Sequence, residues 1–501
     1  MRLPIRTRRR VLVCGAAIAA IVRPSAARAA DKWTEVRSPH FAVTSNASRG
    51  DATMVAWEFE QIRSAIAALW PWLHVDLDKP LEIFAVKDEK SMKALAPQYW
   101  EKNDAVHPVS VWGEGADQNY LALRTDVLSA DNWDRNPYQQ AYFSYASLIL
   151  MQTLPANVPL WFRRGFAAVL SNTVVRQQKL LLGPPIRGYL SVLGSGARLT
   201  VAQLLAVDGN SPELRTEEGL RRFDAESWAL VHFLMFADNG ARWSKLDQYL
   251  KLVDAGTSAA AAFHEALGSP EDVQRLLWVY ISKNVYTFRQ FNLDASVKRE
   301  GFTVTQVGPA DAASRRALFC AAMGRPVESR AAIDEARKAG PAPDSWVAEG
   351  LLLDRENKAD AASAAYAHAA EAGTTDAYAY YRLARLAWRG EADSATLQKV
   401  KGLLGKAVAL NNRYAAAYSM LGEAQSILGD DAGVGMALRA TSLEPTNAYY
   451  HLAAARVLER ARKFEQALQQ AQSASALAPD DAVRREAGDV SKEIERAKGG
   501  S

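Results

Sequence analysis

The chain has 501 residues, of which 49% are hydrophobic and 23% charged, a balance typical of globular proteins that excludes a largely disordered chain. This length exceeds that of a domain with a single hydrophobic core, so we expect two or more domains. The net charge of +4 is concentrated at the start, because residues 1–29 hold seven of the 60 basic residues and none of the 56 acidic ones, which leaves the remainder at −3. Residues 30–501 contain no basic stripe, and we therefore expect no nucleic-acid partner.

The N-terminus has the pattern of a secretory signal peptide. Five arginines precede an apolar run at 11–22, and the small residues AARA follow, which predicts a signal over residues 1–29 with cleavage near Ala29. The run is too short for a permanent membrane span. The sequence TRRRVL approximates a twin-arginine signal, so Sec and twin-arginine export both stay open. We expect a periplasmic or secreted protein, in which Cys320 would be the one remaining cysteine and would have no disulfide partner.

The first part of the mature chain indicates an α+β domain. Short apolar or alternating runs at 40–45, 81–86, 109–112 and 120–123 predict three or four strands of a small, mostly antiparallel sheet. Between the first two runs, apolar residues at positions 55, 59, 62, 66 and 69 recur at helical spacing and predict one buried helix face. Ser48 or Asp51 would cap that helix.

The segment at 136–171 reads NPYQQAYFSYASLILMQTLPANVPLWFRRGFAAVLS. It resembles the site of the gluzincin-type peptidase MA-like family, secreted bacterial domains often fused to tetratricopeptide repeats. There, an HExxH helix is followed by a short turn and by a segment similar to LPLWLNEGLAEF. The phrases WTEVRSPHFAVTSNAS at 33–48 and FDAESWALVHFL at 223–234 also resemble the family in the expected order. The likeness covers about residues 33–283.

The resemblance implies that the metal site has been lost. It places the two histidines at Phe143 and Ser147, the general-base glutamate at Ser144 and the third zinc ligand at Arg164. Zinc hydrolysis needs three protein ligands and an open position for water. Phe143 offers no lone pair, and Arg164 would put a permanent cation where a dication should sit. We therefore expect an inactive metallopeptidase homologue with no catalytic residues, no metal and no cofactor.

Other interpretations of this part stay open. Periodicity alone also fits an amphipathic core helix and a second helix that starts at a proline. An enzyme is the main alternative: an active peptidase whose ligands the sequence does not place, or a hydrolase with Ser144 or Ser147 as nucleophile. None of the seven histidines is spaced as a ligand pair, and His232, inside an apolar stretch, fits a satisfied core histidine. A solvated helix face is the simplest interpretation of the neighbouring carboxylates Asp224 and Glu226.

Helical patterns continue at 217–237, 243–253 and 270–282, and close the first domain at about 283. The following segment, 284–309, has the composition of a linker. It contains two strand-like fragments, at 285–292 and 302–307.

After residue 310 alanine dominates and the chain becomes self-similar. Leu-Glu-Pro at 443–445 recurs as Leu-Ala-Pro at 477–479, a period of 34 residues, and residues 464–479 follow the second-helix pattern of a tetratricopeptide repeat. Five repeats are expected over 310–481, followed by a polar capping helix and tail at 482–501; a generic alanine-rich bundle is the alternative. The expected starts are Ala310, Pro343, Ala377, Arg413 and Ala448, with the third repeat lengthened by ADSATLQK.

Such repeats bind peptides or partner helices along a concave surface formed by the first helix of each repeat. Tyrosine, tryptophan and arginine dominate interface energies, and they recur at positions 2, 5, 9 and 12 of these helices. The candidate partner-binding residues are Tyr378, Tyr381, Arg385, Trp388, Glu423, Tyr449, Leu452 and Arg456.

The sequence therefore predicts two parts: a degenerate, α+β metallopeptidase-like domain over 30–283 and an all-α tetratricopeptide-repeat solenoid. The predicted function is that of a non-enzymatic scaffold of the cell envelope. It would bind a protein or peptide through the repeat groove, and the old cleft could still dock a peptide.

Overall fold

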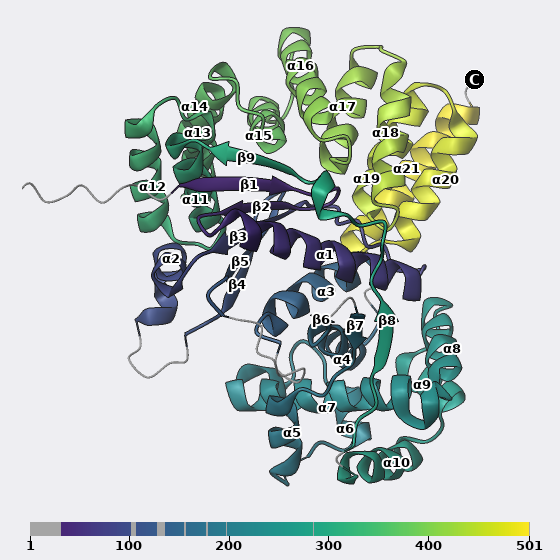
Figure 1. The fold of residues 1–501 in the computed structure, drawn as a ribbon. Helices are drawn as coiled ribbons and strands as arrows, with labels where there is room; N and C mark the ends of the chain where they lie inside the picture. The colour runs from purple at the N-terminus through teal and green to yellow at the C-terminus, as the bar shows by residue number, and fades with distance from the viewer. Residues whose placement is uncertain are drawn as a thin grey trace, which may run out of the picture. The chain divides into compact units, whose positions relative to one another are not determined.

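The computed structural model describes residues 32–101, 107–127, 136–154, 157–176, 179–196, 198–283 and 285–499. The expected signal peptide over 1–29 lies outside these ranges. Figure 1 labels the helices and strands in chain order. Among the described helices, none has the length and the apolar character that crossing a bilayer requires.

A six-stranded sheet, in the order β4-β5-β3-β2-β1-β9, lies at the centre of the first part. The pairings β2 with β3 and β3 with β5 are parallel, and the other three are antiparallel. The expected small sheet is thus larger than predicted and has a parallel centre. Its strands are β1 (Trp33–Arg37), β2 (Ala42–Ser45), β3 (Leu81–Val86), β4 (Ser110–Glu114), β5 (Asn119–Arg124) and β9 (Thr303–Val307).

The segment expected to be a linker contributes strands to two sheets. β9 pairs with β1 at the edge of the large sheet, and β8 joins a second, antiparallel sheet in the order β6-β7-β8. The sequence pattern missed β1, whose short run WTEVR has only two apolar residues and no regular alternation. The strands of the second sheet are β6 (Val174–Arg176), β7 (Lys179–Leu182) and β8 (Arg289–Asn292).

The described residues before β8 form ten α-helices. The first is capped as expected by Ser48, whose side chain accepts from the Asp51 amide. The fourth helix packs so closely on the seventh that a Cβ at Gly165 would lie 2.3 Å from the Ser227 carbonyl oxygen. They are α1 (Arg49–Leu69), α2 (Glu89–Leu95), α3 (Gln139–Thr153), α4 (Leu160–Ser171), α5 (Arg187–Gly194), α6 (Val201–Ala206), α7 (Glu217–Phe236), α8 (Trp243–Asp254), α9 (Ala259–Leu267) and α10 (Pro270–Ser282).

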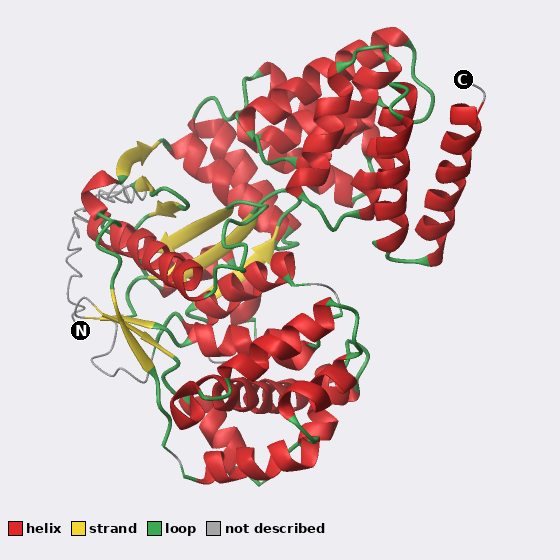
Figure 2. Ribbon diagram, turned by 90° about the vertical axis from the view of Figure 1, so that its right-hand side faces the viewer, coloured by secondary structure: helices red, strands yellow, loops and turns green. Residues whose placement is uncertain are grey.

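Five helix pairs and a final helix follow β9, and Figure 2 shows this region as helices and loops. The expected tetratricopeptide repeats are confirmed, with starts at the predicted residue or within two residues of it. The lengthened third repeat has the longest of the paired helices, α16. The helices are α11 (Pro309–Ala322) with α12 (Pro326–Ala339), α13 (Pro343–Arg355) with α14 (Ala359–Glu371), α15 (Ala377–Ala387) with α16 (Ser394–Leu410), α17 (Ala415–Ile427) with α18 (Ala432–Leu443), α19 (Ala448–Arg460) with α20 (Phe464–Ala476), and α21 (Asp481–Gly499).

The two faces of the large sheet are covered by helices from different parts of the chain. Side chains alternate along a strand, so Ile83 and Ala85 of β3 lie in one core with α1 and α3, while Phe84 and Val86 lie in a second core with α2 and α11. The first repeat therefore completes the sheet domain. Residues 32–501 form one compact unit, and the expected parts at 30–283 and 310–481 share this second core.

We predict that Phe319→Ala in α11 destabilises the sheet and the repeats together. The ring is fully buried, with its centroid 5.2 Å from that of Phe84 and 5.9 Å from that of Tyr120, and such truncations cost about 3–5 kcal/mol. Val327→Ala, 74% exposed in the same repeat, should change the free energy of unfolding by less than about 0.5 kcal/mol. Hydrogen exchange checks the coupling: if β3 amides kept their wild-type protection in Phe319→Ala, the prediction would be wrong.

Candidate functional site

The positions that the resemblance assigns to a zinc site lie together on α3 and α4. Phe143, Ser144 and Ser147 belong to α3, and Arg164 to α4. Phe143 is half-buried, and the guanidinium carbon of Arg164 lies 5.3 Å from its ring centroid, within cation–π range. Residues 21 positions apart in sequence thus meet at one place, and one of them is a cation.

Asp224 of α7 holds this cation. The Arg164 Nε and Nη2 atoms contact the two carboxylate oxygens, with Nη2 to Oδ2 at 2.7 Å. Burial alone would lower the pKa of Arg164, but the hydrogen bonds and charge of Asp224 raise it above its usual range. A bidentate pair of this kind fixes both side chains. Among the described residues, no group of three His, Cys, Asp or Glu side chains is placed to hold a metal ion.

The two candidate serines lie in different surroundings on α3. Ser144 is buried, and its Oγ donates to the carbonyl oxygen of Gln140 in its own helix at 3.0 Å. Ser147 is half-buried on the same helix. No described histidine is hydrogen-bonded to either hydroxyl, whereas a serine nucleophile needs a partner base.

Asp224 and Glu226 do not lie on a solvated helix face, so that interpretation is wrong. They are 9% and 2% exposed, because α7 is buried throughout from 223 to 236 between α4 and α5. Burial raises the pKa of Glu226 to about 7, although the charges of Arg198 and Arg222 and the Leu199 amide oppose the shift. Its Oε1 has no hydrogen-bond partner among the described residues.

His232 is a satisfied core histidine, as its apolar surroundings predict. Its Nε2 lies 2.8 Å from the Gly183 carbonyl oxygen, which can only accept, so Nε2 carries the proton. Nδ1 then accepts from the Tyr280 hydroxyl at 2.8 Å. Burial lowers the pKa of His232 to about 4, against the effect of the Gly183 hydrogen bond.

Two of the predicted partner-binding residues belong to a row of tyrosine rings on the repeats. The ring centroids of Tyr378 and Tyr381 are 6.3 Å apart, and those of Tyr381 and Tyr414 are 5.0 Å apart. All three side chains are half-buried. Tyr414 is not among the expected partner-binding residues, although a fourth repeat that starts at Arg413 places it at position 2. Its place directly before a repeat helix was the signal that could have found it.

The other predicted partner-binding residues divide between surface and core. Arg385 is exposed and Tyr449 is 55% exposed. Leu452 is 3% exposed in the core with α20 and α21, so it cannot contact a partner and this assignment is wrong. Trp388 is half-buried against the core of the third and fourth repeats.

A charged group links the fourth and fifth repeats to the capping helix. Arg456 Nη2 donates to Glu486 of α21 at 2.6 Å. Burial raises the pKa of Glu423, while the charges of Arg456 and Arg460 oppose that shift. These charges are partly engaged within the repeat array and leave Arg385 and Tyr449 as the more accessible positions.

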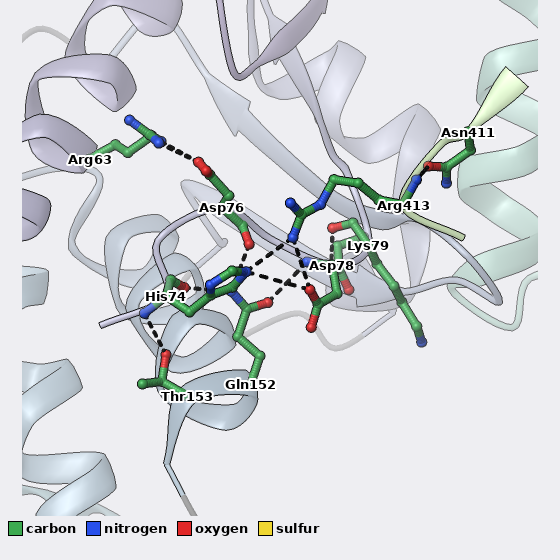
Figure 3. Close-up of polar contacts among 10 residues, drawn as sticks. Arg63, His74, Asp76, Asp78, Lys79, Gln152, Thr153, Asn411 and Arg413 are labelled. Carbon is green, nitrogen blue, oxygen red and sulfur yellow. Dashed lines mark hydrogen bonds and ion pairs between the residues drawn. The ribbon is translucent and has the colours of Figure 1, made fainter. Parts of the chain in front are cut away.

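Part of the repeat surface contacts the chain's own first part. Arg413 Nη2 lies 3.0 Å from His74 Nε2 and 3.3 Å from Asp78 Oδ1, in the loop before β3 (Figure 3). Gln152 at the end of α3 fixes this loop, accepting from the Asp78 amide at 3.1 Å and donating to the Asp76 carbonyl oxygen at 2.9 Å. The fourth repeat is thus hydrogen-bonded to a loop that α3 supports.

The β4–β5 turn brings a further acidic group near the third repeat. Asp376 caps α15 by accepting from the amides of Tyr378 and Ala379. Burial, together with the negative charges of Asp117 and Asp344, raises its pKa. Burial also raises the pKa of Asp117 to about 6, against the effect of Lys79. The acidic turn therefore lies close to the tyrosine row.

Comparisons with known proteins identify no family for the chain. No family model matches it, and no curated protein is similar to it in sequence. Solved structures of repeat proteins are similar at low identity. YrrB, described as a tetratricopeptide-repeat protein with an unusual peptide-binding site, is 18% identical over 36% of this chain and 92% of its own, with a TM-score of 0.31.

PilF of Pseudomonas aeruginosa is 15% identical over 38% of this chain and 93% of its own, with a TM-score of 0.29. A chain in the structure of the APC/C hetero-tetramer Cut9–Hcn1 is 13% identical to this chain. The match covers 74% of this chain and 74% of that one, with a TM-score of 0.30. Scores of this size carry no functional argument. The tetratricopeptide assignment follows from the five helix pairs and their 34-residue period.

We predict that His232→Gln makes the free energy of unfolding fall less than in the wild type as the pH is lowered from 6.5 to 4. The ordinary pKa of histidine is 6.5 and the folded value is about 4, so the unfolded chain takes the proton first as the pH falls. The stability that wild type holds above pH 6.5 is lost progressively down to about pH 4. Relative to the variant, the loss should be about 3 kcal/mol.

The measurement is the difference between the two urea-unfolding profiles from pH 7.5 to 4. A difference is needed because Glu58 and Glu226, whose pKa values burial raises to about 7, contribute the opposite slope between pH 4.5 and 7 in both proteins. Parallel profiles across this window would contradict a buried, neutral His232.

Proposed function

We propose that this protein is a non-enzymatic scaffold of the cell envelope that binds a protein or peptide through its repeats. The observation that carries the proposal is the row of tyrosine rings on the third and fourth repeats, together with the exposed side chains of Arg385 on the third repeat and Tyr449 on the fifth. Aromatic rings and arginine supply most of the energy at protein interfaces. Stacked repeats also provide a rigid surface that can present them.

The exposed ends of this surface are the better places for a partner. The row lies near the chain's own first part, because burial and the charge of Asp117 raise the pKa of Tyr414, and the adjacent Arg413 is hydrogen-bonded to Asp78. Arg385 of α15 and Tyr449 of α19 lack such cover. We therefore assign the partner contact to these two residues, and the cell-envelope location to the signal pattern at 1–29.

We further propose that the first part descends from a zinc peptidase. Two observations support this: Phe143 and Arg164 lie together as ligands of one ion would, and Arg164 is held by Asp224 in a geometry that excludes a dication. A sheet followed by the α3, α4 and α7 helices also fits the family's layout. The serine hydrolase alternative is less well supported, since Ser144 is hydrogen-bonded within its own helix.

The partner prediction is tested by photo-cross-linking. With p-benzoylphenylalanine at position 385 or 449, envelope extract should give an adduct of defined mass. Position 410 is the matched control, because Leu410 is 44% exposed at the end of the outer helix α16. For the partner so identified, Tyr449→Ala or Arg385→Ala should cost about 2 kcal/mol of binding with little change in the melting temperature.

Leu383→Ala serves as the folding control, because this side chain is 6% exposed in the repeat core. It should lower the melting temperature clearly. Equal cross-linking from positions 410 and 449, or unaltered affinity in both surface variants, would show that the repeats do not bind the partner there.

The peptidase ancestry is tested by rebuilding the site. Phe143→His and Ser147→His alone should bind no zinc, because Arg164 still repels the ion. Adding Arg164→Glu and Asp224→Asn completes three ligands without leaving two carboxylates opposed. This fourfold variant should bind about one zinc per chain at micromolar metal. The readout is metal content after dialysis; zinc in both variants or in neither, with both folded by circular dichroism, would contradict the assigned register.

A further inference from the structure

A cavity of about 760 Å³ lies between α1, the β6-β7-β8 sheet and the segment that follows β8. It lies apart from the repeats and from the Arg164–Asp224 pair, neither of which lines it. Its volume falls within the range of about 300–1,000 Å³ that small-molecule and peptide pockets occupy. The walls combine apolar side chains, among them Trp57 and Leu293, with a cluster of charges.

Hydrogen bonds across more than 230 residues fix one wall of this cavity. Trp57 Nε1 donates to the Val297 carbonyl oxygen at 3.1 Å. The Gln61 amide donates to the Asp294 carbonyl oxygen at 3.0 Å and accepts from the Asp294 amide at 2.8 Å. The Asp294 carboxylate in turn accepts from Ser64 and Ser296. The wall is therefore built in advance, and Asp294 is already engaged in holding it.

The opposite wall gathers positive charge. Arg176 of β6 lies directly opposite Lys179 of β7, and Lys179 lies directly opposite Asn292 of β8. All three line the cavity. Among the described residues, Lys179 has only the neutral side chain of Asn292 as a hydrogen-bond partner and no carboxylate within ion-pair distance.

A third cation comes from the short helix after β8. The guanidinium carbon of Arg299 lies 4.0 Å from the Trp57 ring centroid, and Arg299 forms no ion pair with the described part of the chain. Glu58 is the remaining acid on the cavity wall. Its Oε2 accepts from Tyr142 at 3.0 Å, and burial raises its pKa to about 7, against the effects of Tyr142 and Arg299. Within the described ranges, Lys179 and Arg299 are therefore cations of this cavity that form no ion pair with a carboxylate.

We propose that this cavity binds the C-terminal end of a peptide, whose carboxylate pairs with Lys179 and Arg299 and whose last apolar side chain packs against Trp57 and Leu293. Charge-assisted hydrogen bonds from lysine and arginine are the strong ones for a carboxylate. An apolar wall beside them suits a ligand that carries both groups, and capture of a terminal carboxylate is a recurring mode of peptide recognition. This proposal is independent of partner binding by the repeats.

Calorimetry with defined probes tests it on the full chain. One probe is a pool of N-acetylated tetrapeptides that end in leucine, valine or phenylalanine with a free carboxylate, and the other is the same pool with C-terminal amides. The carboxylate pool should bind more tightly than about 1 mM, and the amide pool about tenfold more weakly or worse. Binding of neither pool, or equal binding of both, overturns the proposal.

Adjacent residues give a matched pair of variants. Arg299→Gln and Lys179→Gln should each weaken carboxylate binding about fivefold to tenfold, whereas Lys298→Gln, which removes the same charge from an exposed neighbour outside the cavity, should leave it unchanged. Lys179→Gln should change the melting temperature of the free protein little, since Lys179 is bonded only to the neutral side chain of Asn292 among the described residues. If Lys298→Gln weakened carboxylate binding as much as Arg299→Gln, the effect would be one of general electrostatics and the proposed site would be wrong.

Two further probes separate the sources of negative charge. Inorganic phosphate and 3-phenylpropionate should each bind more weakly than the carboxylate pool, because the first lacks an apolar group and the second lacks the peptide backbone. If either bound as tightly as the pool, the cavity would be a site for that small acid and the peptide assignment would be wrong.

Discussion

The packing of α11 on the large sheet is the contact on which the rest of the arrangement depends. β3 is buried along its whole length, so helices must pack on both faces of the sheet. Helices of the first part of the chain cover most of one face only. The second face is closed by the first repeat, where Phe319 meets Phe84 and Tyr120. Because α11 packs on the sheet, the position and direction of the first repeat are fixed relative to the sheet.

Charge at this interface strengthens its specificity. Arg315 of α11 donates to Glu35 and to Thr44 at 2.8 Å each, from one helix to two strands. Both carboxylates that it approaches, Glu35 and Glu82, are less than 10% exposed. Removing such a cation would leave buried negative charge without compensation. Sliding the repeat along the sheet would break the same contacts, so the network defines one position for α11.

Fixing the first repeat also brings later repeats close to the chain's own loops. Arg413 reaches Asp78 and His74, and the Asp117 turn approaches the cap of α15. The inner repeat surface is thus partly occupied before any partner arrives. The two binding regions that we propose therefore lie apart from these contacts: the exposed positions Arg385 and Tyr449 on the repeats, and the cavity beside α1.

The repeats could be predicted from local sequence patterns. The strand order of the sheet and the arrangement of the site depend on contacts between distant segments. The 34-residue period gave every repeat start to within two residues, since each helix pair follows from its own sequence and its neighbours. The strands β2 to β5 were also visible in short apolar runs. By contrast, β1 and the pairing of β9 with it join residues some 270 apart, and no local pattern encodes that partnership.

Burial was likewise decided by the tertiary structure. Asp224 and Glu226 have the composition of a solvated helix face, and only the packing of α7 between α4 and α5 places them inside, where Arg164 satisfies Asp224. Leu452 falls at a predicted groove position, but it is 3% exposed and belongs to a core that α18, α20 and α21 share with α19. Periodicity fixes which residues share a helix face, but which neighbour covers that face depends on contacts between segments far apart in the chain.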